Sequence, residues 1–315
     1  MATRDFVPRA DGEGSIGTAA KNWKRGYFKE LTLPDDGKKE FLNELVGAFF
    51  GHSAGSHNAL PRGKDLTSYY DSGEMSAAIA AETFDDIFPG DYIIKSITIP
   101  AISYQDDAGN TISKAAQTFA NHKFIIGDLN YHKGRGDTET TKPHVLIFSE
   151  GRLGQSRMNR ENKTDGGYTG SEMWKYIIPK YAEAFQNAFG SSHILSHREL
   201  LTKTTSPTGA SAAGAGWVGT TTDWEWTSVL VNLFNEVMIY GCHPNSSSLY
   251  DVGDCCQQVA AFRHDKKLQT ALRTWNWLRA VASASHFAGA SVASYAAGTS
   301  ASHAGGGVRP YALLT

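Results

Sequence analysis

The chain contains little of what marks the commonest functional classes. Among its 315 residues there are three cysteines, and Cys242, Cys255 and Cys256 form no CxxC pair of the kind that binds zinc or exchanges disulfides. The formal net charge is −2 at pH 7, whereas proteins that bind nucleic acid through its phosphates carry clustered Lys and Arg. We therefore expect reduced core thiols and no nucleic-acid partner.

Long apolar runs are also absent. No stretch approaches the roughly 20 apolar residues that a membrane span requires, and the opening MATRDFVPRADGEG lacks the apolar region of a secretory signal. We expect a protein that is made in the cytoplasm without a signal peptide and inserts in no membrane. A hydrophobic content of 41% still allows a sizeable core, so we expect one large domain with a small appendage.

Catalytic motifs are equally scarce. The sequence contains no Gly-rich phosphate loop, nucleophile elbow or paired-carboxylate motif, and it predicts neither an enzyme nor a bound cofactor. In SHREL, Ser196, His197, Arg198 and Glu199 bring a hydroxyl, an imidazole and a carboxylate together, as a nucleophile with its base would. A helix N-terminus, with Ser196 as its cap and Glu199 at the third position, explains them without catalysis and is the interpretation that we prefer.

Two further groups of charged residues have a structural interpretation. His132, Asp137 and His144, with Asp128 as a fourth candidate, lie near one another in the sequence, but their spacing matches no familiar metal-ligand pattern. Loop polarity and core packing explain them better, so we predict no metal site. Glu236 and Arg263 are flanked by apolar residues, and we expect them to be internal ion pairs or hydrogen-bonding anchors.

Residues 282–307, ASASHFAGASVASYAAGTSASHAGGG, consist almost entirely of Ala, Ser and Gly; we call them the small-residue segment. Such composition is typical of a flexible linker, yet only eight residues follow, so the segment must return to the fold. It contains no Lys, Arg, Asp or Glu, and its one large apolar anchor is Phe287. We predict a surface that tolerates substitution, with Phe287 in the core.

From about Leu60 onward, helix and strand patterns mix without the regular alternation of a parallel α/β sheet, which favours an α+β fold. Helices are predicted over 73–84, with Ser72 as N-cap, and over 169–190, with a restart at Pro179 and a stop at Gly190. Thr202–Gly219 is predicted to be a loop. Strands are predicted at 91–100, 123–126 and 144–148, and WTSVLVNLFNEVMIYG, QQVAAFRHD, TWNWLRAV and VRPYALL are expected to form a closing sheet.

The N-terminal region divides into two short parts. Residues 1–33 are polar with scattered aromatic side chains and are too short for a core of their own. Residues 34–59 carry an apolar stripe at helical spacing, including Leu42, Leu45 and Phe49, and end in a linker over Gly51–Asn58. The stripe either packs on its own domain or forms an oligomerisation seam with neighbouring subunits. Residues 60–315 are expected to form the main domain.

Several segments carry a family resemblance. GRLGQSRMN, GGYTGSEMW, FGSSHILSHRELL, LFNEVMIYG, YDVGDCCQQVAAFRH, WNWLRAV and GVRPYALL together resemble structural proteins of gut-type tailed phages. The resemblance covers about Arg62 to Leu314 and implies a C-type lectin fold, which is shared by formylglycine-generating enzymes and by the variable proteins of diversity-generating retroelements, such as phage major tropism determinants. FVPRADGEGSIGTAAKNWKRGYFKEL is similar to N-terminal attachment segments of phage tail-fibre proteins.

The resemblance implies a homotrimeric receptor-binding protein on the phage virion. Residues 1–33 would attach to other tail proteins, and the small-residue segment would contact a host-surface protein or glycan. In such systems mutagenic reverse transcription rewrites Asn codons, and every residue type in the segment is reachable from one. The segment contains no Asn, so either diversification has replaced them or the gene is not a target. The alternative function is an architectural fibre or decoration protein without a receptor role.

The small-residue segment itself supplies the candidate contact residues. Tyr and His offer contact area and polar tips at low entropic cost. The candidates are Ser283, Ser285, His286, Ser291, Tyr295, Thr299 and His303. The expected rigid surround consists of Trp275, Trp277, Leu278, Val308, Pro310 and Leu313, and Arg279 and Arg309 either pin the ends by hydrogen bonds or are surface charges. Because the side chains are small, one copy should bind weakly and a trimer should gain avidity.

Overall fold

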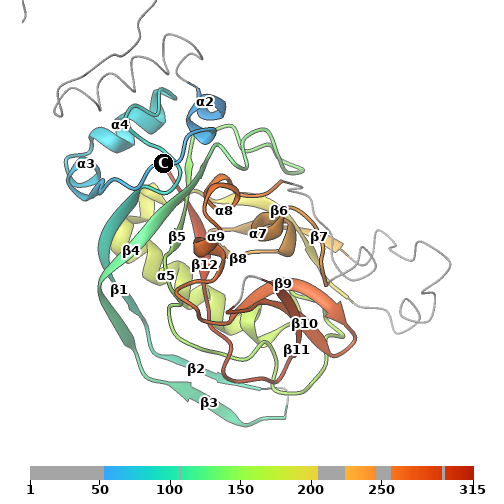
Figure 1. The fold of residues 1–315 in the computed structure, drawn as a ribbon. Coiled ribbons are helices and arrows are strands. Elements are labelled where there is room, and N and C mark those ends of the chain that lie inside the picture. The colour runs from blue at the N-terminus through green and yellow to red at the C-terminus, as the bar shows by residue number, and fades with distance from the viewer. Residues whose placement is uncertain (1–52, 107, 205–223, 246–256, 293–294) are drawn as a thin grey trace, which may run out of the picture. The chain divides into compact units, whose positions relative to one another are not determined.

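The computed structural model describes residues 53–106, 108–204, 224–245, 257–292 and 295–315. The predicted attachment segment 1–33, the apolar stripe of 34–59 and most of the predicted loop Thr202–Gly219 lie outside these residues. Helices and strands are mixed along the described chain, which confirms the α+β class (Figure 1). None of the described helices is long and apolar enough to cross a membrane.

A five-stranded antiparallel sheet forms the centre of the domain (Figure 1). Its strands, in spatial order, are β1 (Tyr92–Ile99), β4 (Gln117–Leu129), β5 (Val145–Ser149), β12 (Pro310–Leu314) and β8 (Val231–Leu233). Every residue of β5 and β12 is buried, because both faces of these apolar runs are covered. The chain thus ends in a strand that lies inside the sheet.

A second antiparallel sheet consists of β9 (Asn276–Ser283), β10 (His286–Ala290) and β11 (Ala296–Ser300), with β10 in the middle. Side chains that alternate along β9 and β10 enter two different apolar clusters. Phe287 belongs to the larger cluster, with Val281 and Trp277, whereas Ala288 belongs to the smaller one. β9 and β10 are therefore buried on both faces, and the small-residue segment is part of the core as well as of the surface.

The longest helical stretch begins as a π-helical turn, η1 (Met173–Ile177), and continues as α5 (Ile178–Phe189), which packs against β1. Pro179 lies in the first turn of α5, where its missing N–H is not needed, and Gly190 follows the last helical residue. The predicted restart and stop are both confirmed. The other described helices are short: α2 (Ala54–Asn58), α3 (Thr67–Asp71), α4 (Glu74–Ala80), η2 (Ser191–His193), α7 (Glu236–Tyr240), α8 (Ala260–His264) and α9 (Lys266–Gln269).

Two hairpins complete the described fold. β2 (Ile102–Gln105) pairs with β3 (Thr111–Lys114), and β6 (His197–Thr202) pairs with β7 (Trp224–Val229). β6 overturns the prediction that SHREL begins a helix. The residues His197, Glu199 and Leu201 alternate inward with half-buried neighbours, as a strand requires, and their long-range pairing with β7 outweighs the local capping pattern.

Other predictions changed in detail. The strands predicted at 91–100, 123–126 and 144–148 correspond to β1, part of β4, and β5. The predicted helix over 73–84 is shorter, since α4 spans Glu74–Ala80; Ser72 ends α3 instead of capping α4, and Gly73, with φ of 83°, takes the N-cap position. The predicted linker Gly51–Asn58 contains α2, which Ser53 caps. LFNEVMIYG and QQVAAFRHD contain α7 and α8 instead of strands.

Three predicted environments were also tested. Glu236 is fully buried and accepts a hydrogen bond from the backbone N–H of Asn245 (3.1 Å), as expected for an internal anchor. Arg263 is exposed, so its prediction as an internal group was wrong. Cys242 is a free thiol but lies at the surface instead of in the core; Cys255 and Cys256 lie outside the described residues.

Candidate functional site

The small-residue segment is held in place through its own backbone. A loop that we call the bracing loop, residues 153–164, runs beside it. Backbone N–H groups of the loop donate to carbonyl oxygens of the segment, Ser156 to Gly306 (2.9 Å), Met158 to Ala301 (3.0 Å) and Thr164 to Ala284 (3.1 Å). Because these bonds use no side chain of the segment, a substitution there leaves them available.

Side chains of the bracing loop add to this attachment. Thr164 Oγ1 donates to the carbonyl oxygen of Ser283 (2.8 Å), and Gln155 Nε2 donates to that of Gly305 (2.7 Å). Asn162 Oδ1 accepts from the backbone N–H of Ala301 (2.9 Å). All three bonds again end on the backbone of the small-residue segment. The loop therefore determines the path of the segment without depending on its sequence.

Two tryptophans limit where the segment can vary. A Cβ atom on Gly306 would lie 2.1 Å from atoms of both Trp275 and Trp277, and one on Gly289 would lie 2.5 Å from Trp275. The indole N–H of Trp277 donates to the carbonyl oxygen of Ser156 in the bracing loop (2.6 Å), which fixes that ring. Tolerance of substitution, predicted for the whole segment, therefore applies only to its exposed positions.

The seven predicted contact residues do not form one cluster. Ser283 and Ser285 lie together at the β9–β10 turn, where their hydroxyls approach His286 Nδ1 at 3.3 and 2.8 Å. Tyr295, 61% exposed, lies beyond the other end of β10, roughly 13 Å or more along the strand.

The remaining candidates have mixed environments. Thr299 is half-buried on β11, and His303 is exposed beside Trp275, with ring centroids 5.5 Å apart. Ser291 is 5% exposed and offers almost no surface to a ligand.

The expected rigid surround is present. Trp277, Leu278, Val308, Pro310 and Leu313 are buried and Trp275 is half-buried. Phe287 is fully buried, as predicted for a core anchor.

Both arginines that flank the segment are hydrogen-bonded anchors and not surface charges. Arg309 and Arg279 are each 2% exposed. Arg309 donates from Nε to the carbonyl oxygen of Ser149 and from Nη1 to that of Leu268, both at 2.8 Å. Arg279 forms an ion pair with Glu199 of β6. The ends of the segment are thereby fixed to β5 of the main sheet, to β6 and to the helical region of α9.

Glu199 is the centre of a buried polar network beneath β9. In addition to Arg279, it accepts from the hydroxyl of Tyr311 (2.6 Å), from His197 Nε2 (2.9 Å) and from Asn232 Nδ2 (3.2 Å). Burial alone would raise the pKa of Glu199, but the guanidinium of Arg279 and the bond from His197 hold it well below its ordinary value. A buried carboxylate with this many donors connects β6, β8, β9 and β12.

The same network contains the one cluster of metal-ligand type among the described residues. Ligand atoms of His132, His197 and Glu199 lie within 4.8 Å of one another, and all three residues are buried. A divalent cation there would lie beside the guanidinium of Arg279 and would compete with the donors that Glu199 already has. The geometry thus fits a hydrogen-bonded network better than a metal centre.

Only two of the four metal ligands considered from the sequence are brought together. His144 Nε2 accepts from the backbone N–H of His132 (3.0 Å), so these two residues do meet. Asp137 instead pairs with Arg198 at the surface (2.8 Å), and Asp128 accepts from the backbone N–H of Ala260 (2.9 Å). Burial raises the pKa of Asp128 to about 6.

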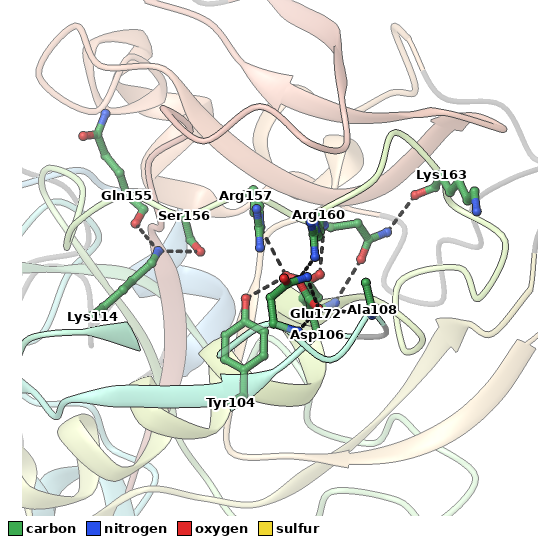
Figure 2. A network of polar contacts seen from close by, with 12 residues as sticks. Tyr104, Asp106, Ala108, Lys114, Gln155, Ser156, Arg157, Arg160, Lys163 and Glu172 are labelled. Atoms are coloured by element: carbon green, nitrogen blue, oxygen red, sulfur yellow. Dashed lines mark hydrogen bonds and ion pairs between the residues drawn. The ribbon is translucent and has the colours of Figure 1, made fainter. Parts of the chain in front are cut away.

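A polar network on the far side of the bracing loop supports it in turn (Figure 2). Lys114 of β3 donates to the carbonyl oxygen of Gln155 (2.9 Å) and to Ser156 Oγ (2.8 Å). Glu172 accepts from the hydroxyl of Tyr104 (2.7 Å) and from Arg157 Nε (3.2 Å). The β2–β3 hairpin and the start of η1 therefore hold the loop that holds the small-residue segment.

Asp106 anchors Arg160 in this network. The Asp106 carboxylate is buried and pairs with Arg160 Nη1 at 2.5 Å. Burial alone would raise its pKa, but the backbone N–H groups of Asn110 and Ala108 and the charge of Arg160 outweigh that effect and lower it. Asp106 was not singled out from the sequence, and GRLGQSRMN, which covers the first half of the bracing loop, was named only for the family resemblance and not as a support for the small-residue segment. The loop's residues, LGQSRMNRENKT, have no hydrophobic period that could have revealed their long-range partners.

Comparisons of the chain with models of protein families, with curated proteins and with solved structures find no match. The class of protein therefore rests on the residues and their geometry.

Proposed function

We propose that the chain is a phage receptor-binding protein that contacts a host-surface protein or glycan through the exposed side chains of the small-residue segment. The observation that carries this proposal is the bracing loop, which grips the segment by its backbone while residues such as Tyr295 and His303 stay exposed. A binding surface whose sequence can change without loss of fold needs this arrangement. The activity is binding, with no catalytic step.

The proposal includes the finer points of fold and assembly. We assign the described domain to the C-type lectin-like fold; its mixed α+β content and the return of β12 into the main sheet are compatible with this assignment. Residues 1–33 would attach to other tail proteins of the virion. A homotrimer would compensate for the weak contact of each small-residue surface by avidity.

Adhesion of the full chain to candidate host cells tests the proposal. Labelled protein is compared with the double variant Tyr295→Ala/His303→Ala by flow cytometry. The matched control is Leu272→Ala, which removes a large side chain that is 63% exposed but lies outside the segment. We expect the double variant to bind about tenfold or more weakly, as loss of aromatic contact residues does, and the control to bind like the unaltered chain.

Two outcomes would overturn the proposal in favour of an architectural role. One is adhesion that the double variant retains in full, with an unchanged melting temperature for each protein. The other concerns the gene. If a near-identical repeat lies beside it, the mismatches between the two copies should fall at template adenines and within codons 282–307. Mismatches spread evenly over the gene would remove the link to diversification.

A further inference from the structure

A polar pocket lies between the bracing loop and η1, outside the small-residue segment. Its cavity volume is about 290 Å³, near the lower end of small-molecule sites. Residues from 159–166 and from 170–176 form its two walls, and Ala108 of the β2–β3 connection also lines it. None of its lining residues belongs to 282–307, so this pocket is separate from the proposed contact surface.

The floor and walls of the pocket are fixed by buried groups (Figure 2). Glu172, 9% exposed, accepts from Tyr104, from Arg157 and from the backbone N–H of Arg160 (2.9 Å). The buried carboxylate of Asp106 holds the guanidinium of Arg160. The ring of Tyr176 stacks on that of Tyr104, with centroids 4.3 Å apart and an angle of 8° between planes. The site is therefore preorganised, which lowers the entropic cost of binding.

The backbone at the back of the pocket is equally constrained. Gly170 donates its N–H to the carbonyl oxygen of Gly166 (2.8 Å), and a Cβ atom on Gly170 would lie 2.4 Å from that oxygen. Any side chain at this position would push the two walls apart. The two glycines thus let the backbones of the two walls approach each other closely.

Other polar groups of the pocket are available to a ligand. Among the described residues, the ammonium of Lys175, the carboxylate of Asp165 and the hydroxyl of Tyr176 have no hydrogen-bond or ion-pair partner. Lys175 and Asp165 are exposed, and Tyr176 is half-buried. These groups supply donors, an acceptor and an aromatic ring to the pocket lining.

The charges of the lining select the class of ligand. Arg160, Lys163 and Lys175 carry three positive charges, and Glu161, Asp165 and Glu172 carry three negative ones. A phosphate or other polyanion would meet the carboxylates, and a metal ion would meet the cations. A ligand with many hydroxyl groups and no net charge can accept from the cations and donate to the carboxylates, while its C–H groups contact the ring of Tyr176.

We propose that this pocket binds one uncharged sugar residue of a glycan. Because residues 159–164 form a pocket wall and also hydrogen-bond the small-residue segment at Ala284 and Ala301, the two surfaces adjoin. An unvarying sugar site would then act beside a variable one, and simultaneous engagement of both would raise the overall affinity through effective concentration.

Titration of the full chain with uncharged sugars tests this site. The probes are glucose, galactose, mannose, N-acetylglucosamine and lactose at millimolar concentrations, with binding followed by saturation-transfer NMR. We expect at least one of these sugars to bind, and both Asp165→Asn and Tyr176→Ala to weaken it about tenfold. Lys180→Ala is the matched control, since Lys180 lies on the same helical stretch, pairs among the described residues with Glu183 alone (2.8 Å) and lies outside the pocket.

Each contrary outcome overturns the sugar site. These are binding by none of the five sugars, binding only of sialic acid or inorganic phosphate when these are added as further probes, and equal effects of the pocket variants and Lys180→Ala. The Tyr295→Ala/His303→Ala variant separates this proposal from the proposed receptor contact. It should keep sugar binding even where it loses adhesion to cells, so either proposal can fail alone.

Discussion

β10 and β11 are neighbouring strands of one hairpin, and small residues fill all five positions of β11 and three of the five in β10, but their environments are opposite. Four of the five residues of β10 are buried, whereas in β11 none is. In β10 the small side chains are needed because two apolar clusters and Trp275 lie close on either side. In β11 all five residues are half-buried or exposed, and no packing against the described residues requires small side chains. The same composition therefore has two causes within one segment.

This difference limits where sequence variation can occur. A segment that presents a changeable surface needs a constant strand beneath it. β10 supplies that strand: it pairs with β9, which Arg279 ties to Glu199, and the bracing loop holds the chain before and after the hairpin at Ala284 and Ala301. If the proposed function is correct, diversity should gather in β11 and in the turns on either side of β10, and the buried residues Phe287–Ala290 should stay unchanged.

The largest expected difference is between substitutions in β10 and in β11, measured as the change in the free energy of unfolding. Phe287→Ala in β10 removes a fully buried ring and should lower the free energy of unfolding by about 3–5 kcal/mol. Thr299→Ala, at the position that pairs with Phe287 across the hairpin, should change it by less than about 0.5 kcal/mol. Urea denaturation measures both. Equal losses would mean that β11 is as firmly packed as β10.

The second prediction concerns the anchor beneath β9. Arg279→Leu leaves the buried carboxylate of Glu199 without its guanidinium and should cost about 3–5 kcal/mol of stability. The double variant Arg279→Leu/Glu199→Gln removes the uncompensated charge and keeps an acceptor for Tyr311 and His197. It should regain much of the loss in the same denaturation experiment. A double variant no more stable than the single one would show that lost packing, and not charge, sets the cost.

The third prediction distinguishes glycines within the segment. Gly306→Ala forces a methyl group against Trp275 and Trp277 and should destabilise by about 1–3 kcal/mol. Gly298→Ala, on the exposed edge of β11, is the control, because the nearest atom to its Cβ would be the end of the flexible Asn245 side chain at 3.1 Å. Thermal unfolding of the two variants should separate clearly. If Gly306→Ala leaves the melting temperature unchanged, the sequence at Gly306 can vary as freely as that of β11.

Local patterns account for the parts that the sequence predicted well. β1 and β5 are compact β-branched runs, and the Pro179 restart and Gly190 stop act within one helical turn. Phe287 could be assigned to the core because it is the one large apolar anchor in a polar neighbourhood.

The parts that could not be predicted depend on distant partners. His197 and Glu199 fit a helix start by local rules, but Arg279 and Tyr311, far along the chain, place them in a buried strand. The burial of Ser291 and the grip of the bracing loop are likewise set by contacts between segments that no local spacing records.

The last prediction concerns a buried histidine of the scaffold that stays constant in sequence. It has the smallest expected effect, a change in the free energy of unfolding with pH. Burial lowers the pKa of His144 to about 4, against 6.5 for the free side chain. The unfolded chain therefore binds a proton that the folded chain refuses, and stability falls as the pH drops from 6.5 towards 4. Between pH 6.5 and 5.5 this histidine should account for about 1 kcal/mol.

The variant His144→Gln isolates that contribution. Glutamine keeps an acceptor for the backbone N–H of His132 and a donor for the carbonyl oxygen of Lys142 but does not titrate. Asp128, whose raised pKa opposes the trend between pH 3.8 and about 6, is common to both proteins and cancels in the difference. Urea denaturation at pH 6.5 and 5.5 should show the unaltered chain losing more stability than the variant. Equal losses of stability in the two proteins would mean that folding does not lower the pKa of His144.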